Sequence, residues 1–276
     1  SVLVTPTQAQ DELIPDEDLS GWSFGWTAGL NGSQAAYSNW SRGGVNTFSA
    51  VGTSQVSAFF REGSFSYGSR LLTNYGETKL EDEGVRKSDD RLSFRNRFLY
   101  DLSDEFGVFL NLDFESQFAN GFDYGAGPDD EDILISSFLA PGYITENSGL
   151  AWYPQDNFSL EAGFGMKQTI VLDTDLGPIY GLDEGERLHN QAGLTTAINF
   201  SQEIFDNVEY SGFIETFTNL NRSIRSTDVT ISNRFIGRIN NFLNMTLQFD
   251  LVYDDDYSTE VQLSQVLSAG ISVVVF

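Results

Sequence analysis

The chain has 276 residues, of which 40% are hydrophobic, and its formal net charge of −25 at pH 7 excludes nucleic acid as a partner, because affinity for phosphate backbones comes from Lys and Arg. It contains no cysteine, which excludes disulfides, thiolate nucleophiles and thiolate metal sites. No apolar run approaches the roughly 20 residues that a membrane-spanning helix requires, so only strands could carry this chain across a membrane.

The first twenty residues show no regular alternation of apolar and polar residues. Residues 1–10 could be the end of a signal peptide, since small residues lie near the expected cleavage site. Residues 11–19 are acidic and include a proline, which favours an irregular segment. We therefore expect residues 1–20 to be a signal-peptide remnant or a flexible periplasmic N-terminal segment. Residues 21–276 are expected to form one domain.

From residue 21 onward, about twelve stretches place an apolar residue at every second position, which is the period of a strand with one apolar face. The stretch over residues 243–253 shows this most plainly, because Leu, Met and Phe alternate there with Asn, Thr and Gln. The least regular stretch is interrupted by Pro141 and Gly142. In chain order, the predicted strands cover residues 22–30, 46–61, 65–71, 92–102, 106–118, part of 133–153, 158–166, 192–200, 208–214, 229–239, 243–253 and 259–276.

The connections between these stretches alternate between tight turns and longer loops. Tight turns fall at residues 62–63, 103–105, 155–157, 206–207 and 240–241. An even number of strands with both ends on the periplasmic side produces this alternation. The sequence therefore predicts an all-β fold, a transmembrane antiparallel up-and-down β-barrel of about 12 strands in a bacterial outer membrane. The alternative, a soluble sandwich or lipocalin-like barrel, would bury its apolar face inside.

If the apolar face meets lipid, the charged residues of the other face line the barrel interior. The hairpin after the fourth strand places Arg95 opposite Asp113, and a hairpin folded between residues 224 and 225 places Glu215 opposite Arg234. Opposite charges on neighbouring strands normally pair. The predicted lumen ion-pair network consists of Arg70, Arg91, Arg95, Arg97, Asp113, Glu115, Glu161, Lys167, Glu215, Arg234, Arg238 and Asp250.

A lumen of this kind has two functional interpretations. A barrel of about twelve strands lies between small barrels filled by side chains and large water-filled porins. A lumen largely closed by ion pairs favours a structural or partner-binding membrane protein. The arginine row of Arg91, Arg95 and Arg97 favours instead a narrow, porin-like channel that selects small solutes or ions. We expect the closed lumen and keep the channel as the alternative.

The interior charges nearly balance, so the excess negative charge must lie in the loops and the N-terminal segment. Clustered carboxylates could hold Ca²⁺, but a solvated acidic surface that binds divalent cations loosely is the simpler interpretation. We expect outer-membrane lipid and lipopolysaccharide as neighbours, and a protein partner at the extracellular loops or the periplasmic N-terminus. The acidic loop residues are Glu81, Asp82, Glu83, Asp129, Asp130, Glu131, Asp132, Asp173, Asp175, Asp183, Glu184, Asp254, Asp255 and Asp256.

Catalytic motifs are weak in this sequence. The single histidine, His189, has no Ser close to it on its own strand, so we interpret it as structural rather than as the base of an outer-membrane lipid hydrolase. Asp113 and Glu115 lie beside arginines, which favours the ionised form of both and disfavours general-acid chemistry. The sequence thus predicts no enzymatic activity, no catalytic residue and no cofactor. An outer-membrane lipid hydrolase, with a Ser supplied to His189 by a neighbouring strand, is the least favoured alternative.

Several short segments resemble a known family. They are Gly21-Trp22, Asn39-Trp40-Ser41-Arg42-Gly43-Gly44, Tyr75-Gly76, Lys87-Ser88-Asp89-Asp90 and Gln117-Phe118. Together they resemble an uncharacterised outer-membrane barrel family of Bacteroidetes-type bacteria, known only as a domain of unknown function. The resemblance is clearest over residues 21–122. It implies an outer-membrane location and brings no activity, substrate or catalytic residue.

The most specific of these segments follows the first strand. Its motif residues Asn39, Trp40, Ser41, Gly43 and Gly44 form a turn in which Trp40 is the only large apolar group and the two glycines permit positive φ. The turn is expected either to fold into the barrel mouth as a plug or to present Trp40 to a protein partner.

Overall fold

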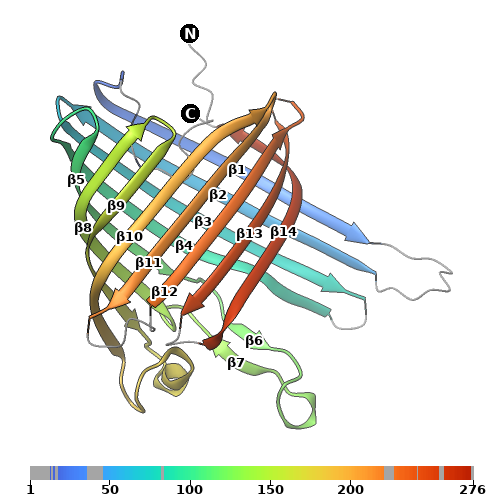
Figure 1. Ribbon diagram of the computed structural model, residues 1–276. Helices are drawn as coiled ribbons and strands as arrows, with labels where there is room; N and C mark the ends of the chain where they lie inside the picture. Colours follow the sequence, from blue (N-terminus) through green and yellow to red (C-terminus); the bar gives the residue numbers. More distant parts are fainter. Residues whose placement is uncertain are drawn as a thin grey trace.

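The computed structural model describes residues 13, 15, 18–35, 46–81, 84–220, 227–240, 242–254 and 258–274. Twelve antiparallel strands close into one barrel, and two short strands form a separate hairpin at one rim (Figure 1). The barrel strands are β1 (Gly21–Ala35), β2 (Thr47–Glu62), β3 (Phe65–Leu80), β4 (Gly84–Asp101), β5 (Phe106–Ser116), β8 (Gly142–Gln155), β9 (Phe158–Ile170), β10 (Leu188–Phe205), β11 (Val208–Asn219), β12 (Thr227–Arg238), β13 (Leu243–Asp254) and β14 (Ser258–Val274).

The barrel confirms the predicted fold class and strand number. Strands that follow one another in the chain are neighbours in the wall, β5 pairs with β8, and β14 closes the barrel against β1. The stretch predicted within residues 133–153 contains two strands, of which only β8 belongs to the barrel. The other, β7 (Ile133–Ser136), pairs with β6 (Gly121–Asp123) outside it. Pro141 directly precedes β8 and has no N–H to donate, which explains why the barrel strand begins there.

The apolar side chains of the strands point outward. Phe24 is 62% exposed, Phe164 68% and Leu263 73%, whereas charged residues at alternate positions face the lumen. A continuous apolar surface of this extent does not occur on a soluble monomer. In an outer membrane it matches the hydrocarbon around it. The protein is therefore an outer-membrane β-barrel, and the soluble alternative is wrong.

The short turns define one rim of the barrel. β1 begins at this rim, because Gly21 lies opposite Arg61 next to the β2–β3 turn. In a barrel with an even number of strands this is the periplasmic rim. Aromatic rings gather near it: Trp22 packs against Phe60 with ring centroids 5.1 Å apart, and others stack similarly on β5 and β8. Such rings form the girdle at a membrane interface.

The opposite, extracellular rim carries an ordered cap, which we define as residues 117–141 and 171–187. It contains the β6–β7 hairpin and two short 3₁₀ segments, η1 (Pro128–Asp130) and η2 (Thr174–Tyr180), which lie beyond the barrel wall in Figure 1. No helix among the described residues is long and apolar enough to cross a membrane.

The two parts of the cap share a small apolar core. Ala140, Val171, Leu176 and Leu182 are at most 5% exposed and pack together. The hydroxyl of Tyr180 also donates to the carbonyl oxygen of Ile135 at 2.7 Å, which fastens η2 to β7. The cap is therefore a packed structure rather than a set of independent loops.

Candidate functional site

The barrel lumen is the first candidate site, because strand register brings opposite charges together there. Arg95 on β4 lies directly opposite Asp113 on β5, and their side chains are 3.5 Å apart. Nearer the extracellular rim, Arg91 and Glu115 approach to 2.6 Å, with roughly half of each side chain exposed. Exposed pairs of this kind add little stability, so the extracellular end of the network contributes less to the stability of the barrel than a buried pair would.

Arg97 forms the most buried cluster in the lumen. Its guanidinium lies 2.6 Å from the Glu161 carboxylate on β9, and β5 and β8 separate the two strands in the wall. Both side chains are only 7% exposed. The guanidinium also donates to Asn111 at 3.1 Å and to the Tyr153 hydroxyl at 2.8 Å, and it lies 5.1 Å from the centre of the Phe109 ring. These contacts offset part of the cost of burying two charges.

A second connection between distant strands lies nearer the extracellular mouth. Lys167 on β9 reaches Asp228 on β12 at 3.2 Å and Asp254 on β13 at 2.6 Å. The strands β10 and β11 lie between Lys167 and its nearer partner strand in the wall. An ammonium group has three donors and no acceptor, so it can serve both carboxylates at once. Lys167 therefore links two parts of the wall across the lumen.

The predicted pairing of Glu215 with Arg234 is wrong. Glu215 lies opposite Thr230, and Arg234 lies opposite Ser211, which shifts the β11–β12 hairpin by four residues from the predicted register. Both registers keep the same faces inward because the shift is even, so apolar alternation cannot distinguish them. Glu215 instead lies near charged residues of both signs on other strands, Arg95 and Lys167 as well as Asp113 and Glu161.

The remaining predicted network residues have mixed partners. Arg238 pairs with Glu209 at 3.2 Å near the periplasmic rim. Asp250 has no cation partner among the described residues and accepts hydrogen bonds from Ser232 at 2.6 Å and Gln248 at 2.8 Å. Arg70 is buried and lies directly opposite Arg95, so β3 and β4 bring arginines side by side.

A part of the N-terminal segment lies inside the periplasmic end of the lumen. Leu13 is 5% exposed, and a β-carbon on the lumen-facing Gly68 would collide with its backbone. Arg61, which also pairs with Asp101 at 3.1 Å, donates to the carbonyl oxygen of Pro15 at 3.4 Å. Two residues of the inner wall, Gly68 and Arg61, thus contact Leu13 and Pro15 before β1. The sequence did not predict this contact.

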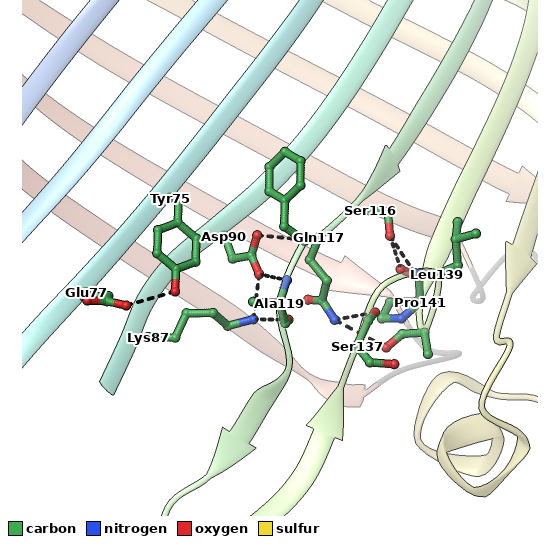
Figure 2. A network of polar contacts seen from close by, with 12 residues as sticks. Tyr75, Glu77, Lys87, Asp90, Ser116, Gln117, Ala119, Ser137, Leu139 and Pro141 are labelled. Atoms are coloured by element: carbon green, nitrogen blue, oxygen red, sulfur yellow. Dashed lines mark hydrogen bonds and ion pairs between the residues drawn. The ribbon is translucent and has the colours of Figure 1, made fainter. Parts of the chain in front are cut away.

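The second candidate site is a polar clamp at the extracellular rim, formed by Lys87, Asp90 and the backbone at Phe118 and Ala119. The Asp90 carboxylate accepts the backbone N–H groups of Phe118 and Ala119 at 2.8 and 2.9 Å, and it pairs with Lys87 at 2.9 Å. Lys87 also donates to the Ala119 carbonyl at 2.9 Å. Figure 2 shows these groups converging where the chain leaves β5. The clamp therefore fastens the start of the cap to β4.

A neighbouring set of contacts fastens the other end of the first cap segment. The Ser116 hydroxyl donates to the Pro141 carbonyl and accepts from the Leu139 N–H, both at 3.0 Å. Gln117 donates to the Ser137 carbonyl at 2.8 Å (Figure 2). The short motif segments at residues 87–90 and 117–118 therefore meet in space, which their separation in the sequence did not show.

Three other sequence predictions concern His189, a metal site and the motif after β1. His189 lies opposite Thr169 at the extracellular end of β10 and has no hydrogen-bond partner within the described ranges. The same ranges contain no group of three or more His, Asp or Glu that could hold a metal ion. The motif Asn39, Trp40, Ser41, Gly43 and Gly44 lies outside the described residues.

Sequence reasoning missed two members of the lumen network. Asp254 looked like part of an acidic loop, but it ends β13 and contacts Lys167. Asp228 is the second residue of β12, where its position two residues before Thr230 on the inward face could have identified it.

A family model described as "Protein of unknown function (DUF3078)" matches residues 33–122. This range includes the Asn39–Gly44 motif and both strands of the Lys87–Phe118 clamp. A comparison with curated protein sequences gives no significant match.

Solved structures of outer-membrane barrels have a similar fold. An outer membrane channel from Pseudomonas putida F1 is 7% identical, with 96% of this chain and 97% of that chain covered and a TM-score of 0.46. The toluene transporter TodX from Pseudomonas putida is 10% identical over 98% and 91%, with a TM-score of 0.39. The translocator domain of the autotransporter NalP from Neisseria meningitidis is 14% identical over 94% and 89%, with a TM-score of 0.38. At these identities the likeness concerns the fold alone.

Proposed function

We propose that this protein is a structural or partner-binding outer-membrane barrel whose lumen is largely closed by ion pairs. The observation that best supports closure is the Arg97–Glu161 pair, because its two buried side chains meet from strands three places apart in the wall. Lys167 adds a second connection, and Leu13 brings backbone into the periplasmic end. These groups occupy space that a passing solute would need.

A narrow, porin-like channel is the second candidate. It is favoured by the neighbouring arginines at positions 70 and 95 and by the exposure of the Arg91–Glu115 pair. Fixed cationic side chains along a constriction would favour anions. For conduction, the Arg97–Glu161 pair, the Lys167 contacts and the segment at Leu13 would have to move.

The extracellular cap is the proposed partner surface. Its two segments carry ten acidic residues against one basic residue, Arg187, and the polar clamp and apolar core hold them in place. Such a surface favours a cationic protein partner, and divalent cations would link it loosely to lipopolysaccharide phosphates. We propose no enzymatic activity and no cofactor for it.

Liposome swelling tests the closed lumen. Purified barrels reconstituted in liposomes should admit small sugars and small anions no faster than protein-free liposomes. The double variant Arg97→Ala with Glu161→Ala removes the cross-lumen pair. It should raise the rate of liposome swelling, because these side chains obstruct the passage. Rapid swelling with the unaltered protein would favour the channel instead.

We also infer a Bacteroidetes-type origin from the Asn39–Gly44 motif, with Trp40 acting as a plug or as a partner anchor. Trp40→Ala should then lower either thermal stability or partner binding. If Trp40→Ala changes neither thermal stability, nor partner binding, nor the swelling rate, Trp40 is neither a plug nor a partner anchor.

A further inference from the structure

The outer wall of the barrel has a shallow groove near the periplasmic rim. Its volume is about 440 Å³, and residues from four neighbouring strands, β10 to β13, line it. Ile204 lies next to the β10–β11 turn, so the groove begins at the rim and rises to the middle of β13. All of its residues occupy outward-facing positions. The lining consists of Ile204, Tyr210, Asn233, Phe235 and Phe249.

Asn233 is the unusual member of this surface, because its amide faces the hydrocarbon. The Tyr210 hydroxyl donates to its Oδ1 at 2.7 Å. Its Nδ2 has no acceptor among the described residues. An unsatisfied donor is costly in hydrocarbon, where no water replaces the missing partner. Inside membranes, Asn side chains in such positions hydrogen-bond across protein contacts.

A matched arrangement on the far side of the barrel lacks the free donor. Asn96 accepts from Tyr67 at 2.9 Å, but its Nδ2 donates to the Leu112 carbonyl at 3.3 Å. In both places the tyrosine ring packs on a phenylalanine, Phe98 or Phe235, with centroids 4.9 Å apart. The two asparagine strands, β4 and β12, are six steps apart in either direction around the ring. The free Nδ2 at Asn233 is therefore specific to this face of the barrel and does not follow from the arrangement of Tyr, Asn and Phe that the two places share.

The same surface carries a knob beside the groove. Phe205 follows Ile204 directly and is 70% exposed.

Gly237 on β12 also faces outward, and a β-carbon there would meet only the Met245 carbonyl, at 4.0 Å. The barrel's own packing therefore does not require a glycine at this position. Small residues on a lipid-facing wall let a second protein approach closely.

We propose that this face, from β10 to β13, binds a second copy of the same chain about a two-fold axis. An amide is suited to such a contact, since each Asn233 can donate through Nδ2 to the free lone pair of the other Oδ1. A two-fold interface uses the same patch on both copies and so needs groove and knob on one surface. Phe205 of one copy and the groove of the other meet this requirement. The contact does not depend on whether the lumen is closed.

Single cysteines test the contact directly, because the chain has no cysteine of its own. Asn233→Cys should form a disulfide-linked dimer when native membranes are oxidised, and Asn96→Cys, in the matched position, should stay monomeric. Equal cross-linking at both positions would show random collision and would overturn the proposal. Absence of cross-linking at position 233 would overturn it as well.

Association in liposomes gives a second test without a new thiol. Energy transfer between labelled copies should report dimers for the unaltered protein and for Asn96→Leu. Asn233→Leu should weaken association about tenfold, as expected for losing two hydrogen bonds in a membrane. Phe205→Ala, a change at an exposed rim position, should also weaken it. A monomer in every case, or a tightly retained lipid in place of the second copy, would contradict the proposed dimer.

Discussion

At the scale of single residues, burial decides which charged pairs matter. Arg97 and Glu161 are nearly inaccessible, whereas Arg91 and Glu115 are about half exposed at the same N–O distance of 2.6 Å. Removing one partner of a buried pair leaves the other charge without compensation, and the cost is then much larger than the net value of the pair. An exposed pair loses little, because water replaces the partner.

The Arg97→Ala variant should therefore lower the free energy of unfolding by about 3–5 kcal/mol, because Glu161 loses its buried partner. Arg91→Ala should lower it by less than about 1 kcal/mol. Urea unfolding of the barrel in lipid vesicles, followed by tryptophan fluorescence, measures both. The double variant Arg97→Met with Glu161→Leu should recover most of the loss. Equal effects of the two single variants would contradict this ranking of the pairs.

Gly68 makes a separate prediction at the residue scale, because the atoms nearest to its missing β-carbon all belong to Leu13. Gly68→Ala should therefore displace the N-terminal segment while leaving the wall intact. A Leu13→Cys reporter should react slowly with a membrane-impermeant maleimide in the parent and faster in the Gly68→Ala background. Gly29→Ala, where the nearest contact is an ordinary 3.6 Å, is the matched control. Unchanged reactivity in the Gly68→Ala background would show that Leu13 does not depend on this contact.

At the scale of elements, the cap depends on a few polar contacts at its two ends. Asp90 is only 2% exposed and satisfies two backbone donors that no strand partner takes up. The Ser116 and Gln117 contacts hold the turn before β8. The cap was also the least predictable element, because its packing does not follow the period of two that identifies strands.

Asp90→Ala should release the start of the cap from β4, since Phe118 and Ala119 lose their acceptor. We expect protease added to intact cells to cut within residues 117–141 several times faster than in the parent, because weakly held segments open locally and expose their backbone to the protease. Glu77→Ala, which removes the exposed hydrogen bond from Tyr75, is the control and should not change the rate. Cleavage that is equally slow in both variants would remove the proposed role of the clamp.

At the scale of the whole molecule, the period of two in the sequence determines much of the fold. It gives the strand number, the lipid-facing side and the periplasmic rim, because one alternation serves both the pleat and the membrane. It leaves open any register that differs by an even number of residues, as the hairpin of Glu215 and Arg234 demonstrates. Contacts such as Arg97–Glu161 arise only when the sheet closes, so neither residue carries a local signal for the other.

Closure of the lumen is also a property of the whole barrel, and single-channel recording tests it most directly. Purified protein would be inserted into a planar lipid bilayer under salt gradients, with insertion verified by recovering folded barrels from the membrane. The Arg97–Glu161 pair, the Lys167 contacts and the segment at Leu13 together predict no steady conductance. Stable openings with a preference for anions would contradict a closed lumen and identify the protein as a selective channel.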